Sequence, residues 1–186
     1  GNSLGGELYS SDGSSINLVK DIYTLANSSS PAYFAVLDSK LYFAANTYDY
    51  GRELWSYDGT SDPSMVEDIS SGSTSSTPGD LTVFNGKLYF SADDGTNGDE
   101  LFVYDGSSVS LVSDINSGSS SSSPRHFHVF DEKLYFSADN NSSGGSVGYG
   151  RELFVFDGTS EVPVMSEKVL ARRLLNPATD PEEEEE

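Results

Sequence analysis

The chain has 186 residues and a formal net charge of −20, from 30 acidic and 10 basic side chains. This charge opposes binding to nucleic acid or to an anionic membrane surface and favours cations or basic partners. The chain has no cysteine, which excludes disulfide bonds, and no apolar run of about 18 residues, so we expect no membrane span.

Short patterns recur along the whole chain and indicate a repeat protein. KLYF begins at Lys40, Lys87 and Lys133, at intervals of 47 and 46 residues. Glu-Leu-aromatic begins at Glu7, Glu53, Glu100 and Glu152, and an Asp-Gly pair follows at Asp12, Asp58, Asp105 and Asp157. Self-similarity at a period of about 20 to 50 residues is typical of tandem structural units.

The units follow one another as a partial copy at 7–22 and full copies at 33–69, 81–115 and 127–165. In the second full copy, strands are predicted at 81–84, 88–92, 100–104 and 109–115. Asn85-Gly86 and Asp105-Gly106 lie between apolar runs and predict hairpins, because these residue types tolerate the positive φ of tight turns. Each full unit therefore reads as a four-stranded antiparallel meander.

The apolar pattern places the strands within each unit. The KLYFSA strand is apolar on both faces, with Leu88 and Phe90 on one side and Tyr89 on the other. This is typical of a strand that is covered above and below. The last strand carries Ser110 and Ser113 among its apolar residues, which predicts an outer strand with more contact with water.

Segments rich in Ser, Gly and Pro separate the units, at 26–31, 70–80 and 116–124. Their composition resists regular structure. Because their length varies little between copies, we expect connectors that cross from an outer strand to the next inner strand, rather than disordered linkers.

Four strands in about 47 residues, repeated in tandem, predict an all-β, β-propeller-like fold of four-stranded blades. The strand count gives about three and a half blades in a repeat domain at 1–166. The segment 167–186 reads as a short amphipathic helix and an acidic tail that cap the domain. The blades therefore belong to a larger ring, or they form an open array capped by this helix or by another subunit.

One stretch carries a resemblance to a known family. ELWSYDGTSDPSMVEDI begins at Glu53, and DLTVFNGKLYFSADDGTNGDELFVYDG follows after a Ser/Gly/Pro stretch. The pattern resembles the ELWxxDGT repeats of bacterial surface and secreted proteins over about residues 6–167. The resemblance implies a propeller-like fold and an extracellular or cell-envelope location. The chain opens with Gly1 rather than Met, which suggests a processed protein or an excerpt from a longer one.

The loop at 93–100 holds the densest group of oxygen ligands, and oxygen-rich turns suit Ca²⁺. The candidate ligands are Asp93, Asp94, Asn97, Asp99 and Glu100. The competing interpretation is that Asp, Asn and Gly simply form the hairpin loop. The equivalent loops at 46–52 and 139–151 carry fewer carboxylates, so calcium is predicted at this loop alone.

The other polar residues that recur favour structural roles. Catalytic residues seldom appear once per repeat, so we expect the repeated Glu and Asp side chains to bond to backbone amides. His126 and His128 alternate on a strand, without a third ligand, and are interpreted as surface residues. No histidine lies next to a nucleophilic serine motif, so no enzyme is predicted. Three residues begin glycosylation triplets in predicted loops, namely Asn27, Asn140 and Asn141.

The favoured interpretation is a non-catalytic extracellular module with a structural or adhesive role. Unpaired blade edges can add strands from another chain, so the expected partners are copies of this chain or other surface proteins in an assembly or filament. The alternative is a propeller that binds carbohydrate or another ligand, with Tyr48, Tyr50 and Tyr149 stacking on sugar rings.

Overall fold

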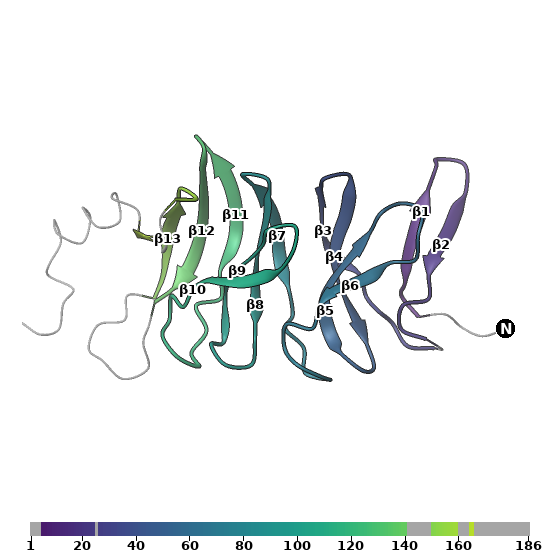
Figure 1. The fold of residues 1–186 in the computed structure, drawn as a ribbon, viewed down its shortest axis with the longest axis horizontal. Helices are drawn as coiled ribbons and strands as arrows, with labels where there is room; N and C mark the ends of the chain where they lie inside the picture. Colours follow the sequence, from purple (N-terminus) through teal and green to yellow (C-terminus); the bar gives the residue numbers. More distant parts are fainter. Residues whose placement is uncertain (1–4, 25, 141–149, 160–163, 166–186) are drawn as a thin grey trace, which may run out of the picture.

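The computed structural model describes residues 5–24, 26–140, 150–159 and 164–165. Within these residues the chain forms β-strands and no helix, so the described part contains no helix that could cross a membrane. Figure 1 shows the strands grouped into upright sheets that stand side by side in chain order. The expected C-terminal helix and tail at 167–186 lie outside the described residues.

The described residues form a first sheet of two strands and then three sheets of four strands, all antiparallel. The two-stranded sheet pairs β1 (Leu8–Ser11) with β2 (Ile16–Lys20). The next sheet contains β3 (Ala32–Leu37), β4 (Lys40–Thr47), β5 (Gly51–Tyr57) and β6 (Ser64–Glu67). Then come β7 (Gly79–Phe84), β8 (Lys87–Asp93), β9 (Asp99–Tyr104) and β10 (Val109–Ser113). The last sheet contains β11 (Arg125–Phe130), β12 (Lys133–Asp139), β13 (Arg151–Phe156) and β14 (Val164–Met165).

Strand order within each sheet follows chain order, so each full unit is a meander. The predicted all-β fold with three and a half propeller-like blades is thereby confirmed. The described sheets form a row and do not close into a ring (Figure 1). Each connector runs from the outer strand of one sheet to the inner strand of the next, as between β6 and β7.

The tight hairpins between the first two strands of each full sheet have the geometry that the sequence predicts. Asn85 and Gly86 have φ of 49° and 69°. The equivalent turns have φ of 48° and 63° at Asp38 and Ser39, and of 49° and 54° at Asp131 and Glu132. Two successive positive φ angles match the type I′ turn, which suits the twist of paired strands.

The Asp-Gly turns differ from the expected tight primed turns. Asp105 begins a four-residue loop in which its Oδ1 accepts hydrogen bonds from the backbone N–H groups of Ser107 and Ser108, at 2.8 and 3.0 Å. Gly106 has a φ of 102°, whereas Asp105 is not in the left-handed region. The aspartate therefore stabilises the turn through its side chain, as an Asx turn does.

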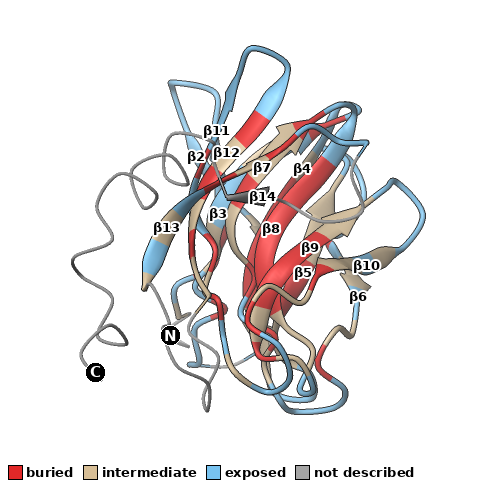
Figure 2. Cartoon of the chain, turned by 90° about the vertical axis from the view of Figure 1, so that its left-hand side faces the viewer, coloured by how far each residue is buried: buried red, intermediate tan, exposed pale blue. Residues whose placement is uncertain are grey.

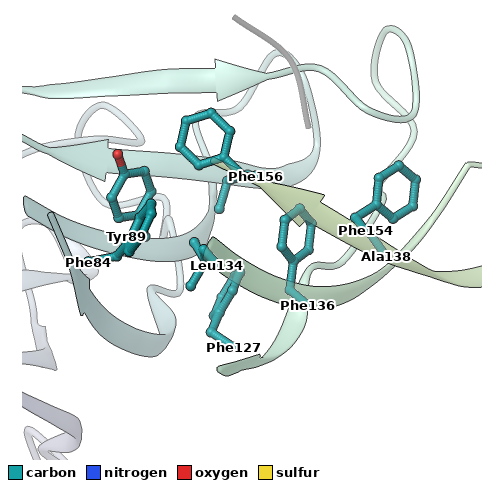
Figure 3. Packing of buried hydrophobic residues seen from close by; sticks show 9 residues of the cluster. Phe84, Tyr89, Phe127, Leu134, Phe136, Ala138, Phe154 and Phe156 are labelled. Atoms are coloured by element: carbon teal, nitrogen blue, oxygen red, sulfur yellow. The ribbon is translucent and has the colours of Figure 1, made fainter. Parts of the chain in front are cut away.

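The core lies between neighbouring sheets, and Figure 2 shows buried residues concentrated along β4, β8 and β9. Between the second and third full sheets, Phe84 and Tyr89 pack against Phe156, with ring centroids 6.4 and 5.6 Å apart (Figure 3). The remaining buried members of this cluster are Leu101, Phe127, Leu134, Phe136, Ala138 and Phe154. Each sheet is thus covered on both faces except at the ends of the row.

Candidate functional site

A buried glutamate links the strand and the connector in each of the first three units. Glu53 lies on β5 and is fully buried. Its Oε1 accepts a hydrogen bond from the Ser76 backbone N–H at 2.8 Å, and its Oε2 accepts from the Ile69 N–H at 3.1 Å. The Ser76 hydroxyl also donates to Oε2, at 2.5 Å. One carboxylate therefore holds both ends of the connector.

The same arrangement recurs at Glu7 and Glu100. Glu100 accepts from the N–H groups of Ile115 and Ser122 at 2.9 and 2.8 Å, and from the Ser122 hydroxyl at 2.6 Å. Glu7 accepts in the same way from Ile22 and Ser29. The interpretation that the repeated glutamates bond to backbone amides is confirmed at these three positions.

Burial raises the pKa of the Glu53 and Glu100 carboxyl groups. The hydrogen bonds from Ser76 and from Ser122 oppose this shift, because they stabilise the ionised form, but burial is the larger effect. These two side chains face backbone donors inside the protein rather than a cleft, so their perturbation accompanies a structural role.

The repeated aspartates lie at the surface and stabilise turns. Asp58 Oδ1 accepts from the backbone N–H groups of Thr60 and Ser61, at 2.8 and 2.7 Å. Backbone hydrogen bonds of this kind lower the pKa of Asp58. In the next unit the bonds from Ser108 and Ser107 lower the pKa of Asp105 to about 2. The structural interpretation of the repeated Asp-Gly pairs is confirmed here as well.

The residues of the predicted calcium loop engage different partners. Asp94 Oδ1 accepts from the backbone N–H groups of Thr96 and Asn97, both at 2.8 Å, and its Oδ2 accepts from the Asn97 side-chain amide at 2.8 Å. Asp93 Oδ1 accepts a hydrogen bond from the backbone N–H of Gly95 at 2.7 Å. Glu100 points instead to the connector, where both carboxylate oxygens accept hydrogen bonds.

Asp99, at the start of β9, is partly buried, and this burial raises the pKa of its carboxyl group. Across the described residues, no group of three or more Asp, Glu, His or Cys side chains is arranged to hold a metal ion. The loop can be built by Asx turns alone, and calcium binding there stays a prediction.

Other residues singled out by the sequence are dispersed over the surface. His126 and His128 are both exposed, and a bulge in β11, where His126 has a φ of 60°, interrupts their regular alternation. Asn27 is exposed and Asn140 is half-buried. Tyr48 is 79% exposed and Tyr50 is 42% exposed. Asn141 and Tyr149 lie outside the described residues. Glycosylation stays a prediction.

The ends of the row leave apolar residues exposed that are buried elsewhere. We call the face of a sheet that packs against the next sheet in the chain its forward face. On the last sheet, the forward face is the one that carries the equivalents of those packed residues. On the forward face of the last sheet, Phe130 is 72% exposed. The equivalent residues of the two earlier full sheets, Leu37 and Phe84, are 4% and 3% exposed.

Two further residues on the forward face of the last sheet are also more exposed than their equivalents in the earlier sheets. Leu153 is 42% exposed, whereas its equivalents Leu54 and Leu101 are fully buried. Tyr135 is half-buried where Tyr42 and Tyr89 are buried. The forward face of the last sheet is therefore an apolar surface whose counterparts in the same molecule are each covered by another sheet.

Contacts between the sheets include hydrogen bonds that the sequence analysis missed. The Asp80 carboxylate on β7 accepts from the backbone N–H of His126 on β11, at 2.7 Å. The Glu67 carboxylate accepts from the backbone N–H of Val109 at 2.9 Å. These partners are about one repeat apart, so only a comparison of equivalent positions in successive units could have suggested them.

Together, the row of four-stranded sheets and the repeated glutamate anchors define an all-β, propeller-like repeat protein. No protein-family model matches the chain, and no curated protein matches it. Among solved structures, the chain is similar to Bacteroides ovatus Xyloglucan PUL GH43B, with 19% sequence identity and a TM-score of 0.41. The match covers 89% of this chain and 31% of that one, so this chain spans less than a third of its length. The resemblance to ELWxxDGT repeats stays a prediction.

Proposed function

We propose that this chain is a non-catalytic structural module of an extracellular or cell-surface assembly, and that it associates through the open forward face of its last sheet. The observation that carries the proposal is the exposure of Phe130, Tyr135 and Leu153, whose equivalents are buried between sheets. A contiguous exposed apolar surface is typical of an interaction site. The extracellular location rests on the resemblance to ELWxxDGT repeats.

The partner that fits this face is another sheet of the same repeat. Within the molecule, the forward face of one sheet packs against Phe127, Phe136 and Phe154 of the next, or against their equivalents. A second copy of the chain carries the same kinds of strands, so copies can meet in a head-to-tail arrangement, which generates open filaments or rings.

Self-association measured by light scattering and sedimentation tests the proposal. We expect the average mass of the full chain to rise with concentration, and the double variant Phe130→Ser, Leu153→Ser to dissociate at least about tenfold more readily, since central apolar residues dominate interfaces. Tyr48→Ser removes a large exposed ring elsewhere and is the matched control. A monodisperse monomer at high concentration, with and without calcium, would contradict the proposal.

A second candidate function is carbohydrate binding, which the two exposed tyrosines of the β4–β5 loop favour. Exposed aromatic rings offer an apolar body with a polar tip for a ligand. If Tyr48 and Tyr50 stack on sugars, the wild-type chain binds members of a glycan array and the variant Tyr48→Ala, Tyr50→Ala does not. Absence of glycan binding by the wild-type chain would remove this candidate.

A further inference from the structure

Within the described residues, the first sheet of the row consists of two strands that match the outer half of a repeat. Its strands β1 and β2 correspond to β5 and β6 of the next sheet. The reason is that Glu7 in the first sheet and Glu53 in the next make the same hydrogen bonds to the connector that follows each of them. In the full sheets, β5 and β9 each pair with a strand on both sides. Within the described residues, β1 pairs with β2 alone, so one edge of β1 has no strand partner.

On the neighbouring sheet, one apolar residue is exposed whose equivalents are buried. Phe34 on β3 is 52% exposed, whereas its equivalents Leu81 and Phe127 are 9% and 8% exposed. Leu81 belongs to the cluster that contains Leu37 and Tyr42, which come from the inner hairpin of the preceding sheet. Phe34 has no preceding inner hairpin among the described residues.

The third junction repeats this relation. Phe127 shares a cluster with Phe84 and Tyr89, the corresponding residues of the β7–β8 hairpin. The first junction has instead a small cluster of four buried residues, namely Leu8, Ile22, Phe43 and Ala45. At the two later junctions, an inner hairpin therefore supplies two apolar side chains, and no counterpart of these side chains lies against Phe34 among the residues that the structure describes.

From these equivalences we propose that the free edge of β1 and the exposed ring of Phe34 together form a docking site for one β-hairpin of the same repeat type. The hairpin pairs its second strand antiparallel with β1 and places two apolar side chains over Phe34. This inference rests on the proposed function in treating the chain as part of a larger array, but it concerns the opposite end of the row.

The register of the docked hairpin follows from the existing sheets. Phe90 of β8 lies opposite Phe102 of β9, and Ser91 lies opposite Leu101. The equivalents of Phe102 and Leu101 in the first sheet are Tyr9 and Leu8. A hairpin with the sequence of β7–β8 therefore places its Phe90 opposite Tyr9 and its Tyr89 toward Phe34.

A copy of one hairpin of this chain can be used to test the docking site. Gly5 occupies the position of Gly98, two residues before the repeated glutamate. Replacing residues 1–4 with a copy of residues 79–97 therefore reproduces the connection between β8 and β9. The protein has no cysteine, so Phe34→Cys introduces a unique thiol for measuring how fast a reagent reaches this position.

We expect the added hairpin to slow labelling of Phe34→Cys by about tenfold or more and to slow hydrogen exchange at the β1 amides, because both become buried or paired. A matched copy that carries Phe84→Ser and Tyr89→Ser within the added hairpin is expected to protect the β1 amides but to leave the thiol accessible. Labelling of Tyr48→Cys, at an exposed position in the β4–β5 loop, should not change in any of these chains.

A hairpin peptide of residues 79–93, added to the unfused Phe34→Cys chain, gives a measurement that does not depend on the fusion folding. Slower labelling that saturates with peptide concentration supports the site. If neither the fused nor the separate hairpin slows labelling, the inference is overturned. If the hairpin protects Phe34→Cys while the unfused chain stays monomeric, the docking site stands and the proposed self-association through Phe130 falls.

Discussion

At the scale of single residues, Glu53 shows how one side chain fixes a long irregular segment. The segment between Ile69 and Ser76 is rich in serine and glycine, and its own composition specifies no regular structure. The carboxylate supplies acceptors to the half-buried N–H of Ile69 at one end and to the buried N–H of Ser76 at the other. Buried amides that lose an acceptor destabilise a protein, so the anchor stabilises the fold.

Replacing Glu53 with glutamine tests this role. One carboxylate oxygen becomes an NH₂ group, which cannot accept from the Ile69 or the Ser76 N–H. We expect Glu53→Gln to lower the free energy of unfolding by about 1 to 3 kcal/mol, measured by urea denaturation. Glu132→Gln alters an exposed glutamate in a turn and is the control. Equal stability of the two variants would contradict the anchoring role.

The turn aspartates predict a specific dependence on acid. The pKa of Asp105 is about 2 in the folded protein, below the ordinary 3.8. Between these values the unfolded chain binds more protons, so the contribution of Asp105 is present above pH 3.8 and is lost as the pH falls toward 2. Asparagine keeps an oxygen acceptor but does not titrate, so Asp105→Asn should lose less stability than the wild type between roughly pH 5 and pH 2.5, where the carboxyl group of the unfolded chain takes up its proton.

Urea denaturation at several pH values measures this difference. Asp58, whose pKa is also lowered by hydrogen bonds from the backbone of its own turn, provides an independent second position. If the wild type and Asp105→Asn lose stability in parallel as the pH falls, the turn hydrogen bonds do not lower the pKa of Asp105 in the folded protein.

At the scale of elements, the type I′ hairpins depend on residues that accept a left-handed backbone. Gly86 occupies such a position without strain, and nothing lies within 4 Å of where its side chain would begin. Glu132 has a φ of 54° at the equivalent position of the last sheet, where a side chain clashes with its own backbone. The same turn is therefore more favourable in the second full sheet than in the third.

A reciprocal pair of substitutions tests this difference. We expect Glu132→Gly to raise the melting temperature and to increase the free energy of unfolding by about 1 kcal/mol. Gly86→Glu should decrease the free energy of unfolding by a similar amount. Both are measured by thermal and urea unfolding. Opposite signs for the two variants are required, and a loss of stability in Glu132→Gly would show that the turn is not strained.

Strands and hairpins could be predicted from the sequence because their signals are local. The turn signal Asn85-Gly86 and the apolar run around Tyr89 each lie within a few residues of the element that they specify. The bulge at His126 was missed, since it arises from a shift in pairing with Ser137 and Tyr135 on the neighbouring strand. The exposure of Phe130 was missed for a related reason: its local pattern matches that of Phe84, and the two differ in that no sheet covers Phe130 in the part of the chain that the structure describes.

At the scale of the whole molecule, electrostatic repulsion opposes the proposed assembly. Each chain carries a formal charge of −20, whereas the proposed contact through Phe130 and Leu153 is apolar. Salt screens repulsion between copies, with a Debye length of about 30 Å at 0.01 M and about 8 Å at 0.15 M. Copies should therefore approach more readily as the ionic strength rises.

We expect the self-association of the wild-type chain to strengthen with added salt, and the double variant Phe130→Ser, Leu153→Ser to show no such gain. Sedimentation equilibrium at several salt concentrations measures both. Weaker association at high salt would indicate an interface built on charge pairs and would rule out the apolar face as the main contact.

The double anchoring of each connector also bears on engineering. Because the Ile69 and Ser76 amides are fastened to the same carboxylate, residues inserted around the exposed Gly72 would enlarge a closed loop without pushing the sheets apart. Lengthening a surface loop costs little, since the entropy of closure grows slowly with its length. The equivalent glycine, Gly118, offers a second such position, so the protein could display foreign peptides at regular intervals along its row.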